Sequence, residues 1–239
     1  MNIRPEDRTT ARLAAAALAL AAALAIAGFT ALGSVFEYPQ ILQEPTDDIL
    51  DLFRRHRAAV MSWFAVLMVS AAMMAPAGIW LGRLVGGPRG RTIAVVGIAA
   101  ATVQVVGLQR WVTLVPTISQ EALDPTRHAD AVHRFELFHT VLGTIIGEIL
   151  GYALTATFTV LVVRALHRSV LPRWLAIVGY AAAVLIATGI VVPLIEAASL
   201  TNFLGYILWC IWLLALAVML FRVRTSRQSS PGLTEPPLR

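Results

Sequence analysis

Residues 203–221 read FLGYILWCIWLLALAVMLF, nineteen consecutive residues without a charged side chain. A helix of about 20 apolar residues is long enough to cross a hydrocarbon core of about 30 Å. Lipid offers no hydrogen-bond partners, so the backbone of such a stretch must satisfy its own polar groups, as an α-helix does. The stretch therefore predicts a membrane-spanning helix.

Five further stretches have the same character and complete an all-α fold, a polytopic bundle of six transmembrane helices. They are residues 13–35, 58–81, 93–115, 138–163 and 174–195. The chain has 239 residues, of which 58% are hydrophobic and 14% are charged. Soluble domains have about 45–50% apolar and about 25% charged residues. We therefore expect one transmembrane domain over residues 13–221.

The arginines predict the orientation of the bundle, because cytoplasmic connections are enriched in basic residues. One side carries twelve flanking arginines, namely Arg4, Arg8, Arg12, Arg83, Arg89, Arg91, Arg164, Arg168, Arg173, Arg222, Arg224 and Arg227. The other side carries five, namely Arg54, Arg55, Arg57, Arg127 and Arg134. Both termini are therefore expected in the cytoplasm, with residues 1–12 as a short segment and residues 222–239 as a disordered tail. A cleaved signal peptide is the alternative interpretation of the first span.

Charge and cysteine content exclude several classes of function. The net charge of +5 comes from short arginine clusters between apolar runs, which favours a topology signal over a nucleic-acid surface. The single Cys210 excludes an internal disulfide and a cysteine-based zinc site. No nucleic acid and no cofactor is expected, and the bilayer is the first partner.

Two ionisable residues lie within the predicted spans, where charge costs about 2.5–3.5 kcal/mol at the centre of a helix. Arg110 is about 9 Å below the outer end of the third helix, and Glu148 about 15 Å below the start of the fourth. We predict a buried Arg110–Glu148 pair between these antiparallel helices. The pair is either an orientation lock or the lining of a ligand or proton pocket.

Small residues recur every fourth position on the fourth helix, at Gly143, Gly147 and Gly151. Such a row lets another helix approach closely. We predict helix packing for these glycines, either within the chain or between two copies. His139 extends the row toward the outside.

A polar row lies beside the glycines, because Glu148, Tyr152, Thr155 and Thr159 share a helical face. A lipid-facing surface would be apolar, so this face is expected to point inward onto a small wet cavity. The third helix adds two amides to that cavity, Gln104 and Gln109. The ligand-binding candidates are accordingly Arg110, Glu148, His139, Gln109 and Tyr152.

The two longer outer connections each predict a short helix. Thr46 is the expected N-cap of an amphipathic helix that continues to Arg57, and a second helix is expected from Thr126. Two carboxylate–histidine pairs have a spacing of three, namely Asp130 with His133 and Glu136 with His139. Such a spacing occurs in carboxylate metal sites. The HExxH pattern is missing, so we predict no metal.

Three stretches resemble an uncharacterised bacterial family of small multi-pass membrane proteins, catalogued as a domain of unknown function. They are residues 36–46 (FEYPQILQEPT), 107–116 (GLQRWVTLVP) and 139–152 (HTVLGTIIGEILGY). The resemblance extends over residues 13–221 and includes both Arg110 and Glu148. It implies the same multi-pass fold, and it implies no activity.

Three functions remain open from the sequence. The leading hypothesis is a non-enzymatic protein of the bacterial plasma membrane that binds a lipid, a small ligand or a partner membrane protein near the outer leaflet. The second is a membrane-embedded enzyme for a lipid or isoprenoid, with Glu148, Glu37 or Glu196 as acid or base and His139 assisting. The third is a small transporter, although the chain shows no clear inverted repeat.

Overall fold

A computed structural model of the chain describes residues 5–167, 169–195 and 197–222, and it is almost entirely helical over these residues. The elements in chain order are α1 (Pro5–Phe36), η1 (Gln40–Gln43), α2 (Thr46–Arg55), α3 (Arg57–Ala72), α4 (Met74–Val85), α5 (Gly87–Thr113), α6 (Val115–Glu121), α7 (His128–Phe138), η2 (His139–Leu150), α8 (Gly151–Leu166), α9 (Arg173–Ala187), η3 (Thr188–Val191) and α10 (Ala198–Phe221).

Six helical runs are long and apolar enough to cross a membrane, which confirms the predicted all-α, six-span fold. Their bounds are Asp7–Phe36, Arg57–Val85, Gly87–Glu121, His128–Leu166, Arg173–Val191 and Ala198–Phe221. Residues 223–239 of the predicted tail lie outside the described residues, and so do five residues named above: Arg4, Arg168, Glu196, Arg224 and Arg227.

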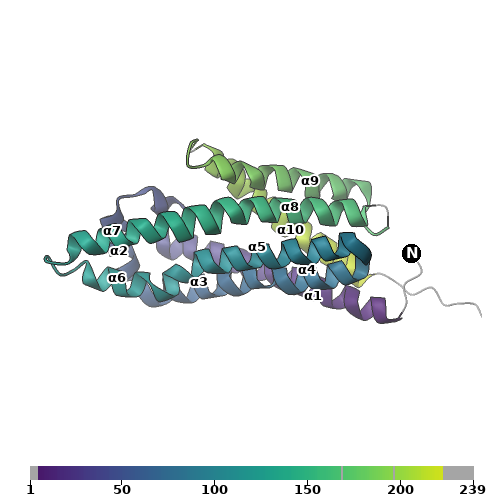
Figure 1. Cartoon of the computed structure of the whole chain (residues 1–239), viewed down its shortest axis with the longest axis horizontal. Helices are drawn as coiled ribbons and strands as arrows, with labels where there is room; N and C mark the ends of the chain where they lie inside the picture. Colours follow the sequence, from purple (N-terminus) through teal and green to yellow (C-terminus); the bar gives the residue numbers. More distant parts are fainter. Residues whose placement is uncertain (1–4, 168, 196, 223–239) are drawn as a thin grey trace, which may run out of the picture.

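The spans form a ring in which neighbours in sequence are neighbours in space. α1 packs against α3 and α4, these pack against α5, and α5 packs against η2 and α8. α9 then lies between α8 and α10, and α10 returns to α1. Figure 1 shows the long helices running along one common axis. Short connections produce this order, because they place consecutive helices side by side and antiparallel.

One half of the ring's interior is apolar. It is the half toward the start of α5 and the end of α10, and its largest fully buried side chains include Leu18, Met74, Leu81, Phe158 and Trp212. Alanines of α1 let the neighbouring helices approach in this half. The result is a closely packed end of the bundle.

The opposite end of the bundle extends beyond the ring of spans and contains α2, α6 and α7 (Figure 1). We call it the α2 end. Its core is aromatic. The Trp111 ring stacks on Phe64 at 4.9 Å and meets Phe36 edge-on at 5.1 Å, measured between ring centroids. Phe53 of α2 and Phe135 of α7 complete the cluster. Trp111 is fully buried, and its ring contacts link the third span to α1, α2, α3 and α7.

Polar contacts fasten α2 across this end. Arg54 donates to the Ser119 carbonyl at 2.8 Å, and His128 lies 2.9 Å from the Asp47 carboxylate. Thr46 is the first residue of α2 and does not cap it, since Pro45 holds the N-cap position. Its hydroxyl instead donates to Glu136 of α7 at 3.2 Å.

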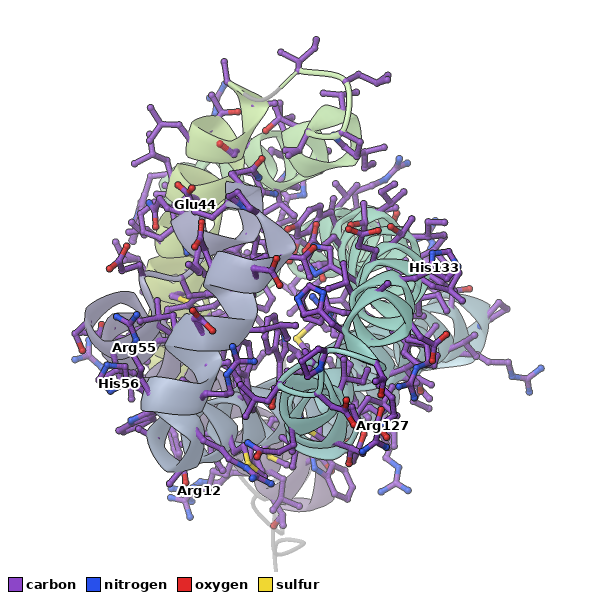
Figure 2. All side chains as sticks on the ribbon, turned by 90° about the vertical axis from the view of Figure 1, so that its left-hand side faces the viewer. Arg12, Glu44, Arg55, His56, Arg127 and His133 are labelled. Carbon is purple, nitrogen blue, oxygen red and sulfur yellow. The ribbon has the colours of Figure 1, made fainter. Side chains whose placement is uncertain are left out.

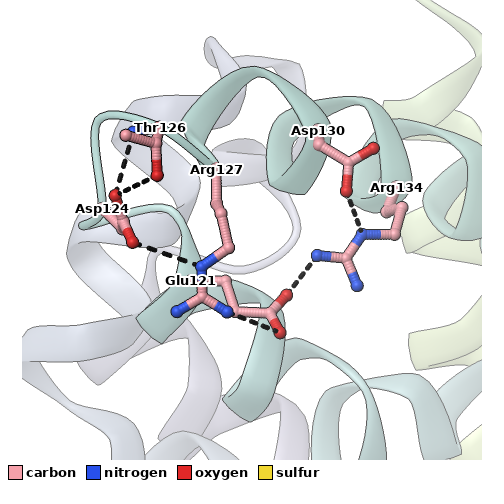
Figure 3. Close-up of polar contacts among 6 residues, drawn as sticks. All are labelled: Glu121, Asp124, Thr126, Arg127, Asp130 and Arg134. Carbon is pink, nitrogen blue, oxygen red and sulfur yellow. Dashed lines mark hydrogen bonds and ion pairs between the residues drawn. The ribbon is translucent and has the colours of Figure 1, made fainter.

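The third and fourth spans are longer than predicted and meet at a short connection of residues 122–127 (Figure 3). Asp124 accepts hydrogen bonds from the Thr126 amide (2.9 Å) and hydroxyl (2.7 Å), which lower its pKa. Arg134 contacts Glu121 and lies 3.3 Å from Asp130. These contacts allow the helices to continue beyond the apolar segments that predicted them.

Candidate functional site

The third and fourth spans come closest where two glycines meet. A Cβ added at Gly107 would lie 2.5 Å from the Gly147 Cα, and one added at Gly147 would lie 2.9 Å from the Gly107 Cα. Gly143 faces the Arg110 guanidinium in the same way, and Gly151 faces Gln104. The glycine row of the fourth span thus lies along α5, and the absence of side chains permits this approach.

Residues 139–150 form a π-helix, η2, in this part of the fourth span. A π-helix joins residues five apart by its hydrogen bonds, whereas an α-helix joins residues four apart. The angular positions of Gly143, Gly147 and Glu148 around the axis therefore differ from those of an α-helix. Nothing in the hydrophobic pattern of residues 139–150 predicts this change of period.

Arg110 is buried, with 4% of its surface exposed. Its Nη1 donates to the Gly107 carbonyl at 2.6 Å, and its guanidinium carbon lies 5.3 Å from the centre of the Trp111 ring. Its Nε has no hydrogen-bond partner among the described residues. A buried polar atom without a partner costs about 1–3 kcal/mol, and more when the group is charged.

The structure does not contain the direct pair predicted for Arg110 and Glu148. No ion pair joins them among the described residues, although the two side chains interact electrostatically. The guanidinium instead donates to the Gly107 carbonyl and packs against Gly143. Both charged groups therefore lie inside the bundle without neutralising each other by contact.

Three tyrosines lie within electrostatic range of the Glu148 carboxylate: Tyr38, Tyr152 and Tyr206. Phe29 connects them, with its ring 5.9 Å from Tyr38 and 6.5 Å from Tyr206. Tyr152 meets Tyr206 edge-on at 5.8 Å. Arg110, Glu148 and these three tyrosines form what we call the polar cluster.

Tyr38 reaches the cluster because the chain reverses after α1. Glu37 adopts a left-handed conformation with φ of 51°, a common way to end a helix. The Tyr38 amide then donates to the Leu32 carbonyl at 3.3 Å. Burial raises the pKa of Tyr38, Glu148 raises it further, and Arg110 acts in the opposite direction. The phenol is therefore neutral near pH 7 and can donate a hydrogen bond.

Tyr38 and Tyr206 are not among the ligand-binding candidates that the sequence predicts. Tyr38 lies in a connection, and Tyr206 lies in an apolar run where an aromatic residue suggests only packing. The available signal was the FEYPQIL stretch itself, which the resemblance included.

Hydrogen bonds between buried polar side chains continue the cluster toward the centre of the bundle. Gln104 donates to the Thr155 hydroxyl at 3.0 Å, and the Trp209 indole donates to the Thr159 hydroxyl at 2.9 Å. The predicted inward-facing row of the fourth span thus meets α5 and α10. Gln109 differs from Gln104, because its side-chain oxygen accepts from Thr113 of the same helix at 2.7 Å.

His139 lies at the α2 end of η2 and is half-buried. Its ring stacks on Phe135 at 5.6 Å, and its Nδ1 has no hydrogen-bond partner among the described residues. Arg110 lies within electrostatic range of the ring. His139 therefore borders the polar cluster and is not part of a carboxylate pair with Glu136.

The other histidines of this end lie on the surface. Figure 2 shows the molecule from the α2 end, with His56 and Arg55 on one side and His133 on the other. Within the described ranges, no three His, Cys, Asp or Glu side chains gather as a metal site would require. Asp130 forms an ion pair with Arg134 at 3.3 Å. The i, i+3 spacing of Asp130 and His133 therefore does not correspond to a common metal site.

Comparison with known proteins identifies the family. No curated protein and no solved structure matches the chain. The family model described as "Domain of unknown function (DUF4386)" matches residues 5–217. The match covers the polar cluster and five complete spans together with most of the sixth. The chain is a multi-pass membrane protein that belongs to the DUF4386 family.

Proposed function

We propose that this protein is a non-enzymatic receptor for a lipid headgroup, or for a small ligand of the same chemistry, which binds in the polar cluster at the outer leaflet. In this proposal the protein is in a bacterial plasma membrane, both termini are cytoplasmic, and the α2 end faces outward. The arginine distribution supports that orientation.

The observation that carries the proposal is the unpartnered Nε of Arg110 in a buried cluster. Charged groups within a membrane protein usually have a partner in the bundle. Glu148 is near but not in contact, and the Arg110 guanidinium contacts one carbonyl. A bound oxygen ligand would satisfy the remaining donor and offset the cost of burying the charge.

The depth of the cluster supports a ligand from the outer leaflet. Arg110 lies seventeen residues beyond Ile93, where the apolar segment of the third span begins, and this length of helix measures about 26 Å. The hydrocarbon core is about 30 Å thick, so in the proposed orientation Arg110 lies in its outer part. The half-buried side chains of Glu148, Tyr152 and Tyr206 leave the cluster partly accessible.

The apolar half of the interior favours binding over transport. Phe158, Val162, Trp212 and Leu216 are fully buried on the side of the cluster away from the α2 end. They form a packed layer beyond the hydrogen bonds of Thr159. A polar solute would have to displace these side chains to continue through the bundle. In this proposal a ligand therefore reaches the polar cluster from the outer side of the membrane only.

The test is retention of lipid by the purified protein. Native mass spectrometry of the wild type in mild detergent should show a bound lipid, and Arg110→Met should lose it. Arg91→Met is the matched control, since Arg91 is exposed and lies on the same helix. Arg110→Met should remain folded, because an apolar side chain removes the unpartnered charge. Equal lipid retention by both variants would refute the proposal.

A measurement of turnover separates binding from catalysis. The retained lipid should be recovered chemically unchanged after prolonged incubation with the wild type. A time-dependent product that the Glu148→Gln variant fails to form would show that the protein is an enzyme and would overturn the non-enzymatic part of the proposal.

A further inference from the structure

We infer that the polar cluster recognises a zwitterionic headgroup, in which an ammonium is joined to a phosphate, as in phosphatidylethanolamine. The inference rests on the proposed function and specifies the ligand class of that site. It follows from three observations on the described residues: a buried guanidinium with an unpartnered Nε, a nearby carboxylate that forms no ion pair with it, and a series of aromatic rings beside that carboxylate.

Arg110 supplies the anion-binding half of the site. A guanidinium presents several donors in one plane, which suits the oxygens of a phosphate. The Gly107 carbonyl occupies Nη1, while Nε has no partner among the described residues. Gly143 packs directly against the guanidinium, since a Cβ there would lie 2.6 Å from the guanidinium carbon. Any larger residue at that position would displace the group that must contact the phosphate.

Glu148 and the aromatic rings supply the cation-binding half. Ammonium groups are attracted to aromatic faces within about 6 Å of the ring centre, and aromatic cages bind such ligands. Tyr38, Phe29, Tyr206 and Tyr152 form a continuous series of ring contacts at 5.8–6.5 Å. Glu148 lies four residues before Tyr152, about one helical turn, and is within electrostatic range of all three tyrosines, so the carboxylate lies beside this series of rings.

Only a ligand with both charges satisfies both halves. A purely anionic headgroup would satisfy Arg110 and be repelled by a Glu148 carboxylate. A purely cationic ligand would have the opposite conflict with Arg110. The two residues interact electrostatically without forming an ion pair, so the site has one positive and one negative group to offer. A zwitterion leaves neither buried charge unmatched.

Competition between two lipids tests the inference. The wild type is equilibrated with equal amounts of phosphatidylethanolamine and phosphatidylglycerol of identical acyl chains, and the retained lipid is quantified by native mass spectrometry. A hydrogen bond to a charged group contributes about 1.5–3 kcal/mol, so the ethanolamine lipid should be preferred about tenfold or more. Equal retention of the two lipids would overturn the inference.

Two variants sharpen the test. Glu148→Gln removes the negative charge at nearly constant shape, so the preference should shift to phosphatidylglycerol. Glu44→Gln changes an exposed glutamate at the same end and should keep the wild-type preference. An unchanged preference in Glu148→Gln would contradict the assigned cation-binding half. Thermal unfolding of each variant in detergent verifies that the fold is intact.

The source of the headgroup is tested with soluble glycerophosphoethanolamine. Weaker binding of this compound than of the diacyl lipid supports a membrane lipid as ligand, and equal binding supports a soluble zwitterion. Binding of glycerophosphoglycerol with the same affinity would refute headgroup recognition. Retention that depends on Arg110 without headgroup selectivity would refute this inference alone, whereas retention independent of Arg110 would refute the proposed function.

Discussion

Replacing Gly107 by alanine should destabilise the bundle at the crossing that supports the polar cluster. The new Cβ would lie 2.5 Å from the Gly147 Cα and 2.9 Å from the Leu142 carbonyl oxygen. Carbon atoms pack best at about 3.5–4.0 Å, so α5 and η2 would have to separate by about 1 Å. Both neighbours are backbone atoms, and a rotamer change cannot relieve the overlap.

Two opposing terms determine the size of the effect. Overpacking of a closely packed interior typically costs about 1–3 kcal/mol. Alanine also favours a helix over glycine by about 1 kcal/mol. Gly33→Ala isolates the second term, because a Cβ at Gly33 of α1 would be 3.7 Å from its nearest neighbour, the Tyr38 carbonyl oxygen. Gly107→Ala should therefore be less stable than Gly33→Ala by about 1–3 kcal/mol.

The assay is reversible unfolding of the purified protein in mixed micelles with increasing dodecyl sulfate, followed by circular dichroism. The free energy of unfolding is compared between the two variants and the wild type. Lipid retention should also fall in Gly107→Ala, since the separation displaces Arg110 from η2. Equal stabilities of Gly107→Ala and Gly33→Ala would refute the close crossing.

Three other measurements examine separate parts of the molecule. Trp111→Ala should lower the free energy of unfolding by about 3–5 kcal/mol in the same assay, because Trp111 is fully buried among aromatic rings. Trp174→Ala is the control and should change the free energy of unfolding little, since Trp174 is 56% exposed. Asp124 has a lowered pKa, so its stabilising contribution is present at neutral pH and is lost as pH falls through that lowered value. Thr126→Ala should raise the Asp124 pKa toward 3.8 in a carboxyl NMR titration. An unchanged titration would contradict the assigned hydrogen bonds. A C-terminal green fluorescent protein fusion should fluoresce and a C-terminal alkaline phosphatase fusion should be inactive in a bacterial host, whereas the reverse result would invert the proposed topology.

Hydropathy was sufficient for the architecture but not for the ends of the helices. Each apolar run became a span, yet the third continued to Glu121 and the fourth began at His128. Those additional turns are polar and lie at the α2 end, where Arg134 and Glu121 form contacts that hydropathy does not register. The two amides of the third span were also indistinguishable by composition. Their directions differ because they are five residues apart on α5, and only Gln104 meets α8.

The sequence by itself determined that this chain spans a membrane six times, because a lipid phase requires each apolar segment to satisfy its own backbone as a helix. It also identified Arg110 and Glu148, since a charge within such a segment is costly enough to be noticed. Only the tertiary structure decided how these two residues relate. Arg110 donates to the Gly107 carbonyl and packs against Gly143 instead of pairing with Glu148, and Tyr38 lies within electrostatic range of Glu148. Both arrangements depend on how segments distant in sequence lie against one another, which a periodicity calculated along one helix does not contain.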